Sequence, residues 1–248
     1  MKKVGIIGGS GLDNPEILKN PLEHKHLTSF GPPSSSILEG KINEVDVALV
    51  ARHGRNHTIP PSQVNNRANI MALSERGCTH IIATTACGSL REEIGRGDFV
   101  IPDQFIDFTR HRISTFYDSF KPGEMKHTPM AEPFDKSMAG IIAREAESLG
   151  IKCRKGGTII TIEGPRFSTR AESNMFRLWG ADLVNMSTAP EVSLANEAGI
   201  PYAAIAMSTD YDCWKTDEEA VSWEEVIKVF NQNVHKVIAL ISSTVKSL

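Results

Sequence analysis

Short apolar runs alternate with longer amphipathic segments along the chain. The short runs have the length and the β-branched content of strands, and the longer segments repeat their apolar positions with the period of a helix. This alternation predicts an α/β fold in which helices connect the strands of a sheet. We expect strands at residues 3–8, 35–40, 45–51, 80–85, 98–106, 156–162, 181–186 and 202–208. We expect helices at about residues 61–76, 134–149, 169–178, 190–198 and 223–245.

Three of the expected helices carry a start signal. Thr169, Thr188 and Ser222 each precede a glutamate by three residues, which is the spacing of a capping box. In the second of these helices Pro190 also stands at the first helical position, where proline is favoured. A capped helix that follows a strand and a loop is a good place to bind an anion.

The segment 107–133 has no clear period. It contains aromatic residues, histidines, prolines and a glycine. A loop of this length in a compact domain is usually a lid, a binding loop or a subunit contact. The chain shows no internal repeat, low-complexity tract or change to a linker-like composition, so we expect residues 1–248 to form one domain.

Composition excludes several classes of function. The chain has 248 residues, of which 40% are hydrophobic and 23% are charged, as expected for a globular protein with a sizeable core. The 27 basic and 30 acidic residues give a net charge of −3, which provides no field for binding nucleic acid or an anionic membrane. An anionic ligand therefore needs a locally positive pocket.

Targeting and cysteine patterns favour a cytoplasmic location. The apolar stretch near the first residue is too short for a signal peptide, and no run reaches the length that crosses a bilayer. The four cysteines form no Cys-x-x-Cys pair, so neither a zinc site nor a disulfide framework is expected.

Two carboxylates follow the expected strand 202–208. Asp210 and Asp212 are two residues apart, and in a strand such residues point to the same face. If the strand continues through residue 212, the two acids meet, and each raises the pKa of the other by disfavouring its charge. A raised carboxyl pKa suits a general acid near neutral pH, whereas the common alternative is a turn in which aspartates accept backbone hydrogen bonds.

Other expected strand ends carry groups that can bind an anion. Because open α/β sheets bind ligands outside the carboxyl ends of their strands, we expect these groups to share one mouth. An arginine there suits a bidentate grip on phosphate, and Phe167 can lie against a flat heterocycle, although each motif taken singly also suits a turn, a cap or the core. The segments are Gly8–Gly11, Arg52–His57, Thr84–Ser89, Glu163–Ser168 and Met186–Thr188.

Several well-known sites are missing from the sequence. The glycines match neither a dinucleotide fingerprint nor a P-loop, and no Gly-x-Ser-x-Gly elbow is present. His53 and His57 have the spacing of a helical zinc pair, but Gly54 and Pro60 argue against a helix and the glutamate of His-Glu-x-x-His is absent. No metal site is therefore expected.

Six blocks of the sequence form a recognisable set, namely Gly5–Leu12, Ala51–Ile59, Thr84–Ile94, Glu163–Ser168, Asn185–Ser187 and Ser208–Lys215. Together they resemble the trimeric purine nucleoside phosphorylase family, and within it the 5′-methylthioadenosine phosphorylases. The resemblance extends from the first strand to about residue 230. It implies one α/β domain with a central mixed sheet flanked by helices, and a homotrimer or a multiple of trimers. The implied reaction uses phosphate as a co-substrate, and no metal or organic cofactor, to split 5′-methylthioadenosine into adenine and 5-methylthioribose 1-phosphate.

The same resemblance implies roles for individual residues. Asp210 is implied as the catalytic acid at purine N7, with Asp212 near the exocyclic amine. The implied phosphate ligands are Ser10, Arg52, His53, Thr85, Ala86 and Ser187. The implied purine and ribose walls are Phe167, Ser168 and Met186, and the implied 5′-group pocket contains Trp223, Val226 and a His127 lent by the neighbouring subunit.

Specificity depends on two features. A carboxylate accepts a hydrogen bond from a 6-amino group but faces another acceptor in a 6-oxopurine, so an aspartate reader favours 6-aminopurines. Members of the resembled family usually continue past the equivalent of Leu248 with a tail that helps to close the 5′ pocket, and the resemblance implies a smaller aliphatic residue where this chain has Trp223. The 5′ preference is therefore expected to be less strict, with adenosine as a further candidate substrate.

Three alternatives remain open. One is a purine nucleoside phosphorylase of broader or 6-oxopurine specificity, acting on methylthioinosine or inosine. Another is a non-catalytic nucleoside- or phosphate-binding protein, which phosphate-dependent release of adenine distinguishes from an enzyme. A nicotinamide-dependent oxidoreductase is the weakest, because the glycine spacing and the ribose-reading acid are missing.

Overall fold

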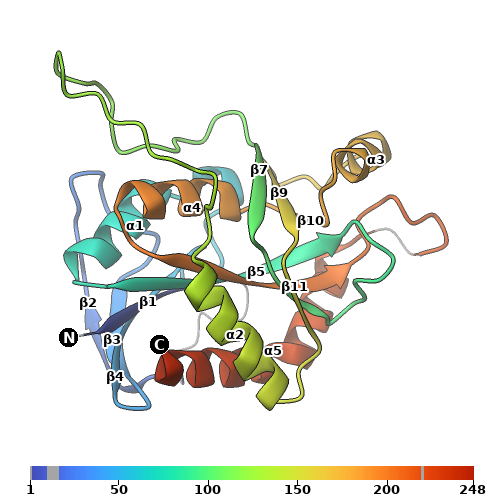
Figure 1. The fold of residues 1–248 in the computed structure, drawn as a ribbon, viewed down its shortest axis with the longest axis horizontal. Helices are drawn as coiled ribbons and strands as arrows, with labels where there is room; N and C mark the ends of the chain where they lie inside the picture. The colour runs from blue at the N-terminus through green and yellow to red at the C-terminus, as the bar shows by residue number, and fades with distance from the viewer. Residues whose placement is uncertain (1, 10–16, 219–220) are drawn as a thin grey trace.

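The computed structural model describes residues 2–9, 17–218 and 221–248, which form one mixed sheet with helices on both faces (Figure 1). The expected single α/β domain is confirmed. The strands are β1 Lys3–Gly8, β2 Lys19–His24, β3 Ile37–Ile42, β4 Val45–Ala51, β5 His80–Ser89, β6 Phe99–Ile101, β7 Gln104–Phe108, β8 Cys153–Lys155, β9 Thr158–Ile162, β10 Leu183–Asn185 and β11 Tyr202–Asp210. The helices are α1 Asn66–Glu75, α2 Lys136–Ser148, α3 Arg170–Leu178, α4 Thr188–Glu197 and α5 Trp223–Ser247, with a 3₁₀ turn at Pro61–Gln63.

Strand β5 is the centre of the sheet. It pairs in parallel with β1 near its start and with β11 along most of its length, and its end pairs in antiparallel with β10. On one side the order continues from β1 through β4 and β3 to β2, and on the other it continues from β10 through β9 to β7. Because β4, β1, β5 and β11 run in parallel, their carboxyl ends lie at one edge of the sheet.

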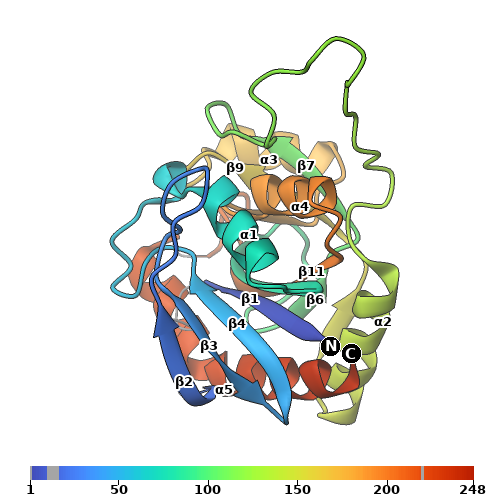
Figure 2. The same ribbon diagram turned by 90° about the vertical axis from the view of Figure 1, so that its left-hand side faces the viewer.

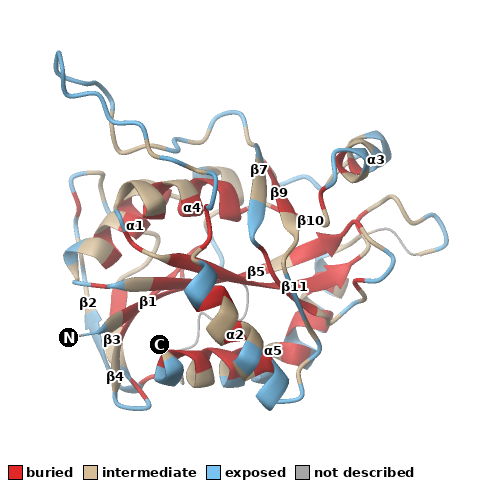
Figure 3. Cartoon of the chain, viewed as in Figure 1, coloured by how far each residue is buried: buried red, intermediate tan, exposed pale blue. Residues whose placement is uncertain are grey.

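Helices α2 and α5 cover one face of the sheet, and α1 and α4 cover the other (Figures 1 and 2). Met138 and Phe230 belong to the core on the first face, and Leu73 and Val192 belong to the core on the second. The central strands are buried on both sides (Figure 3). This explains why their sequences are continuous apolar runs and not alternating patterns.

The sequence prediction differs from the structure at several elements. The single strand expected at 98–106 is two strands, β6 and β7, separated at Pro102 and Asp103. Strand β2 was not predicted, because it is a mostly exposed edge strand without an apolar run. The helix expected from residue 61 begins at Asn66, after the 3₁₀ turn.

Two of the three expected caps are present. Thr169 and Glu172 form a complete capping box, and the Ser222 side chain accepts a hydrogen bond from the Glu225 N–H. The cap expected at Thr188 is wrong, because α4 begins at Thr188 itself and Pro190 is its third residue. The N-cap of α4 is a serine whose side chain makes no capping bond.

The segment between β7 and α2 is irregular, as expected, and extends away from the body of the molecule (Figures 1 and 2). Phe120 and Met125 are exposed on it. Elsewhere, all four cysteines are free. Within the described ranges, no helix combines the length and apolar character needed to cross a membrane.

Candidate active site

A cavity of about 760 Å³, including its open mouth, lies at the carboxyl ends of the strands. The structure brings twelve residues with an expected site role to its walls. The expected Ser10 lies outside the described residues, and His127 does not line the cavity. The twelve are Arg52, His53, Thr85, Ala86, Phe167, Ser168, Met186, Ser187, Asp210, Asp212, Trp223 and Val226.

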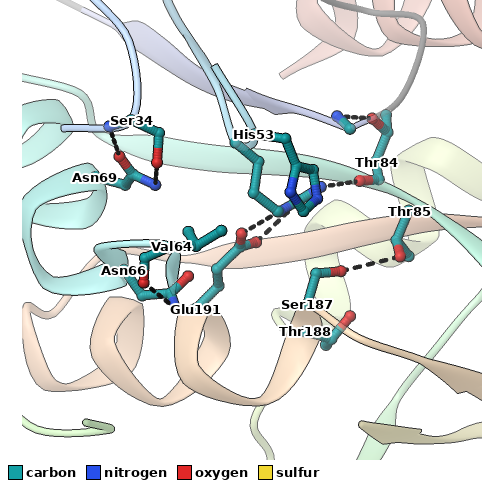
Figure 4. Close-up of polar contacts among 12 residues, drawn as sticks. Ser34, His53, Val64, Asn66, Asn69, Thr84, Thr85, Ser187, Thr188 and Glu191 are labelled. Carbon is teal, nitrogen blue, oxygen red and sulfur yellow. Dashed lines mark hydrogen bonds and ion pairs between the residues drawn. The ribbon is translucent and has the colours of Figure 1, made fainter. Parts of the chain in front are cut away.

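Arg52 is the cationic group of this cavity. It follows β4 directly and is almost fully buried. Its Nη1 donates to the Thr84 carbonyl oxygen at 2.9 Å, and its Nε and Nη2 donate to the carboxylate of Glu191. The dashed lines that meet at Glu191 and Thr84 in Figure 4 mark these bonds. A guanidinium held in this way presents a fixed plane to an anion.

The hydroxyl groups of Thr85 and Ser187 meet in the same cavity as Arg52. Thr85 Oγ1 on β5 lies 3.0 Å from Ser187 Oγ at the start of α4 (Figure 4). The Asn185 side-chain amide donates to both oxygens, at 2.9 and 3.2 Å, and to Thr188 Oγ1 at 2.6 Å. This last bond engages the side chain that was expected to cap α4. The network orients two hydroxyls at a helix N-terminus, which is an arrangement that suits an anion.

His53 contributes a neutral ring to the site. Its Nδ1 lies 2.9 Å from the Ile59 carbonyl oxygen. Burial, reinforced by the positive charge of Arg52, lowers the pKa of His53 to about 4. The ring of His57 lies between those of His53 and Trp223, with centroid distances of 4.5 and 5.0 Å. His57, which the sequence did not single out as a site residue, thus links the anion side of the cavity to Trp223.

The two aspartates meet at the carboxyl end of β11, but strand geometry does not bring them together. Strand β11 ends at Asp210, and Asp212 has a φ of +49°, in the left-handed region. The Asp212 N–H donates to Asp210 Oδ1 at 2.8 Å, and Thr209 Oγ1 donates to Asp210 Oδ2 at 2.8 Å. A side chain at Gly88 would come within 2.9 Å of Asp210 Oδ1, so glycine makes room for the pair. A turn therefore produces the convergence.

The pKa of Asp210 is raised to about 6. Burial is the largest cause, and the neighbouring charge of Asp212 makes only a smaller contribution. The expectation that mutual repulsion sets this pKa is therefore corrected. The pKa of Asp212 is raised as well, again mainly by burial. A carboxyl group with a pKa near 6 can hold and release a proton near neutral pH.

Arg112 is a further residue that the sequence analysis missed. Its side chain is almost fully buried at the root of the projecting segment. It donates to the carbonyl oxygens of Met186 and Glu163 at 2.5 Å, and Glu163 in turn accepts from the backbone N–H groups of Arg110 and His111. These bonds fix the root of the segment against the strand ends that carry the cavity wall.

His127 lies on the projecting segment, where its ring packs against Phe120 at 6.2 Å. Its expected place in the pocket of a neighbouring subunit stays a prediction. The sequence pattern predicts Glu191 as the glutamate of a capping box, whereas in the structure its carboxylate pairs with Arg52. The sequence signal for a site role of Glu191 was its place shortly after a polar strand end. Its partner Arg52 could not be found in this way, because it lies 139 residues away in the sequence.

The site thus combines an oriented guanidinium and hydroxyls with an acid that titrates near neutrality. Such a cavity can hold an oxyanion and protonate a leaving group. Within the described ranges, no three His, Cys, Asp or Glu side chains gather in a way that could hold a metal ion.

The chain is similar to known proteins over nearly its full length. Residues 3–246 match a family model described as the phosphorylase superfamily. The chain is 58% identical over 250 residues to S-methyl-5′-thioadenosine phosphorylase of Xenopus tropicalis, covering 99% of this chain and 89% of the relative. It is 54% identical over 248 residues to the protein of the same name from Danio rerio, with the same two coverages.

Solved structures give the same result. Methylthioadenosine phosphorylase from Schistosoma mansoni in complex with adenine has a TM-score of 0.94 and 45% identity, covering 99% of this chain and 91% of that one. A variant of adenosine/methylthioadenosine phosphorylase from the same organism, in complex with methylthioadenosine, has a TM-score of 0.92 and 44% identity, with the same coverages.

Proposed function

The chain belongs to the phosphorylase superfamily, and from this membership we propose that it is a 5′-methylthioadenosine phosphorylase. It cleaves 5′-methylthioadenosine with inorganic phosphate to adenine and 5-methylthioribose 1-phosphate, a pentosyl transfer. The observation that carries the proposal is one cavity with an anion grip at Arg52, Thr85 and Ser187 and a buried acid at Asp210. Relatives of that name match the chain from end to end.

The reaction follows from the two ends of the cavity. A phosphate oxygen attacks C1′ as the C1′–N9 bond breaks, so positive charge develops on the ribose and negative charge on the departing purine. The bound phosphate stabilises the first charge and is already in place to attack. Protonated Asp210 transfers its proton to N7 and neutralises the second. Adenine then leaves as a neutral molecule.

The base is selected by Asp212, whose carboxylate accepts from the 6-amino group of adenine. A phosphorylase that prefers 6-oxopurines is disfavoured for the same reason. Adenosine is a second candidate substrate, because the structural relative from Schistosoma mansoni is titled an adenosine/methylthioadenosine phosphorylase. We propose that phosphate is the only co-substrate and that no metal or organic cofactor takes part.

We further propose a homotrimer, or a multiple of trimers, that works in the cytoplasm in purine and methionine salvage. Support for the assembly comes from the projecting segment, which exposes Phe120 and Met125 and carries His127, a residue that does not line the cavity of its own chain. Support for the location comes from the four free cysteines, which suit a reducing compartment.

A phosphate-dependent assay tests the function. Release of adenine from methylthioadenosine and adenosine, and of hypoxanthine from inosine, is measured with and without phosphate. We expect rapid release from methylthioadenosine only when phosphate is present, with little release from inosine. Nucleoside binding without product would support a non-catalytic binding protein instead.

A further inference from the structure

Glu191 is a carboxylate next to the site that the proposed reaction does not use. Its side chain is completely buried, and it is not among the described residues that line the cavity, whereas Arg52 is. Any effect of Glu191 on the ligand therefore passes through Arg52.

The contacts of Glu191 hold the guanidinium from one edge. Its Oε1 accepts from Arg52 Nε and its Oε2 accepts from Arg52 Nη2 at 3.0 Å. The Thr84 carbonyl oxygen holds the opposite edge through Nη1. Hydrogen bonds on these two edges fix the plane of the guanidinium.

Tyr202 holds the carboxylate in turn. Its hydroxyl donates to Glu191 Oε2 at 2.9 Å, and the residue is buried at the start of β11. Burial, together with the nearby carboxylate, raises the pKa of Tyr202, so the hydroxyl keeps its proton and donates it. Tyr202, Glu191 and Arg52 thus form a row of three buried polar side chains, and Arg52 at its end lines the cavity.

Stability alone is a weak reason for this arrangement. Removing two charges from water costs about as much as their attraction returns, so a buried ion pair often stabilises a fold no more than apolar residues would. What the hydrogen bonds do provide is a fixed orientation of the Arg52 guanidinium. Helix α4 contributes to both parts of the anion grip, because Ser187 at its N-cap meets Thr85 and Glu191, one turn later, meets Arg52.

We propose that Glu191, held by Tyr202, is a positioning residue that orients Arg52 toward phosphate. The inference rests on the proposed function, since it takes Arg52 as the phosphate ligand. It assigns to Glu191 an effect on phosphate binding and little effect on nucleoside binding.

The test compares Glu191→Gln and Tyr202→Phe with the wild-type chain. KM is measured separately for phosphate and for methylthioadenosine, and the Kd of inorganic phosphate is measured by calorimetry without nucleoside. We expect Glu191→Gln to raise both phosphate constants about tenfold or more, as for the loss of a hydrogen bond to a charged group, with the KM of methylthioadenosine within about twofold. Tyr202→Phe should raise the phosphate constants a few-fold.

Glu197→Gln is the matched control. Glu197 lies on the same helix, but its carboxylate binds Thr115 and Phe116, so both phosphate constants should stay unchanged. A folded Glu191→Gln chain with unchanged phosphate binding would overturn the proposal, because the Arg52–Glu191 ion pair would then be purely structural. Tighter phosphate binding would overturn it as well, because the negative charge of Glu191 would then only repel the phosphate. If that variant does not fold, unchanged phosphate binding by Tyr202→Phe overturns it. A wild-type chain that binds phosphate without turnover contradicts the proposed function and leaves the calorimetric comparison valid.

Discussion

The backbone N–H of Asp212 donates a hydrogen bond to Oδ1 of Asp210 at 2.8 Å. This bond ties Asp212, the proposed reader of the base, to Asp210, the proposed acid, through a turn in which residue 212 is in the left-handed region. Burial raises the pKa of both side chains, and that of Asp210 reaches about 6. In the proposed function, Asp210 therefore donates the proton and Asp212 selects the base.

Asp210→Asn should lower kcat for methylthioadenosine by roughly 10²-fold or more, because an amide cannot transfer a proton to N7. In the wild-type enzyme kcat should fall as pH rises above about 6, since the protonated fraction of Asp210 decreases. Steady-state rates at saturating phosphate between pH 5 and 9 measure both effects. Near-normal turnover in the variant would exclude Asp210 as the general acid. The same fall in kcat with rising pH in both proteins would also exclude it.

Asp210 should also make stability depend on pH. Its pKa is higher in the folded chain than in the unfolded chain, so its contribution to stability is fully present below about pH 4 and is lost as pH rises through 6. A shift of this size corresponds to about 3 kcal/mol in the free energy of unfolding. Asp210→Asn should therefore gain stability over wild type at pH 8 and show no such gain at pH 4. Denaturant unfolding at the two values measures the difference, and an equal effect at both would contradict the assignment.

Asp212→Asn should relax the choice of base. The wild-type enzyme should prefer methylthioadenosine over methylthioinosine by about 10²-fold or more in kcat/KM, because a carboxylate faces the O6 acceptor of the second substrate. An asparagine can donate to O6, so the ratio should narrow at least tenfold. Equal kcat/KM values in the wild-type enzyme would overturn the role of Asp212.

Trp223→Val should make the enzyme more selective for methylthioadenosine, because the resemblance implies a smaller aliphatic residue at this place in the proposed 5′ pocket. The ring of Trp223 lines the cavity and packs against His57 at 5.0 Å. A smaller aliphatic side chain leaves more room for the methylthio group, so the KM of methylthioadenosine should fall several-fold, whereas the KM of adenosine, which lacks the methylthio group, should change much less. Adenosine serves as the internal control, and an equal change for both nucleosides would place Trp223 outside the 5′ pocket.

Local patterns predicted most of the helices and strands, and the errors have physical reasons. The buried central strands are continuous apolar runs, so they were recognisable, whereas the exposed edge strand β2 has no such run. Thr188 and Glu191 matched a capping box, but the Thr188 hydroxyl accepts from the Asn185 side chain three residues earlier, and Glu191 pairs with Arg52, 139 residues away. Local signals give way when tertiary contacts offer a better hydrogen bond.

The sequence by itself determined the α/β class, the polar strand ends and the family whose blocks they form. Those features depend on local composition and on side-chain type, which can be read along the chain. Only the tertiary structure decided that burial sets the pKa of Asp210, that a turn joins it to Asp212, and that Glu191 and Tyr202 stand behind Arg52. Burial and long-range pairing arise when distant segments pack together, so they have no signature in any one segment.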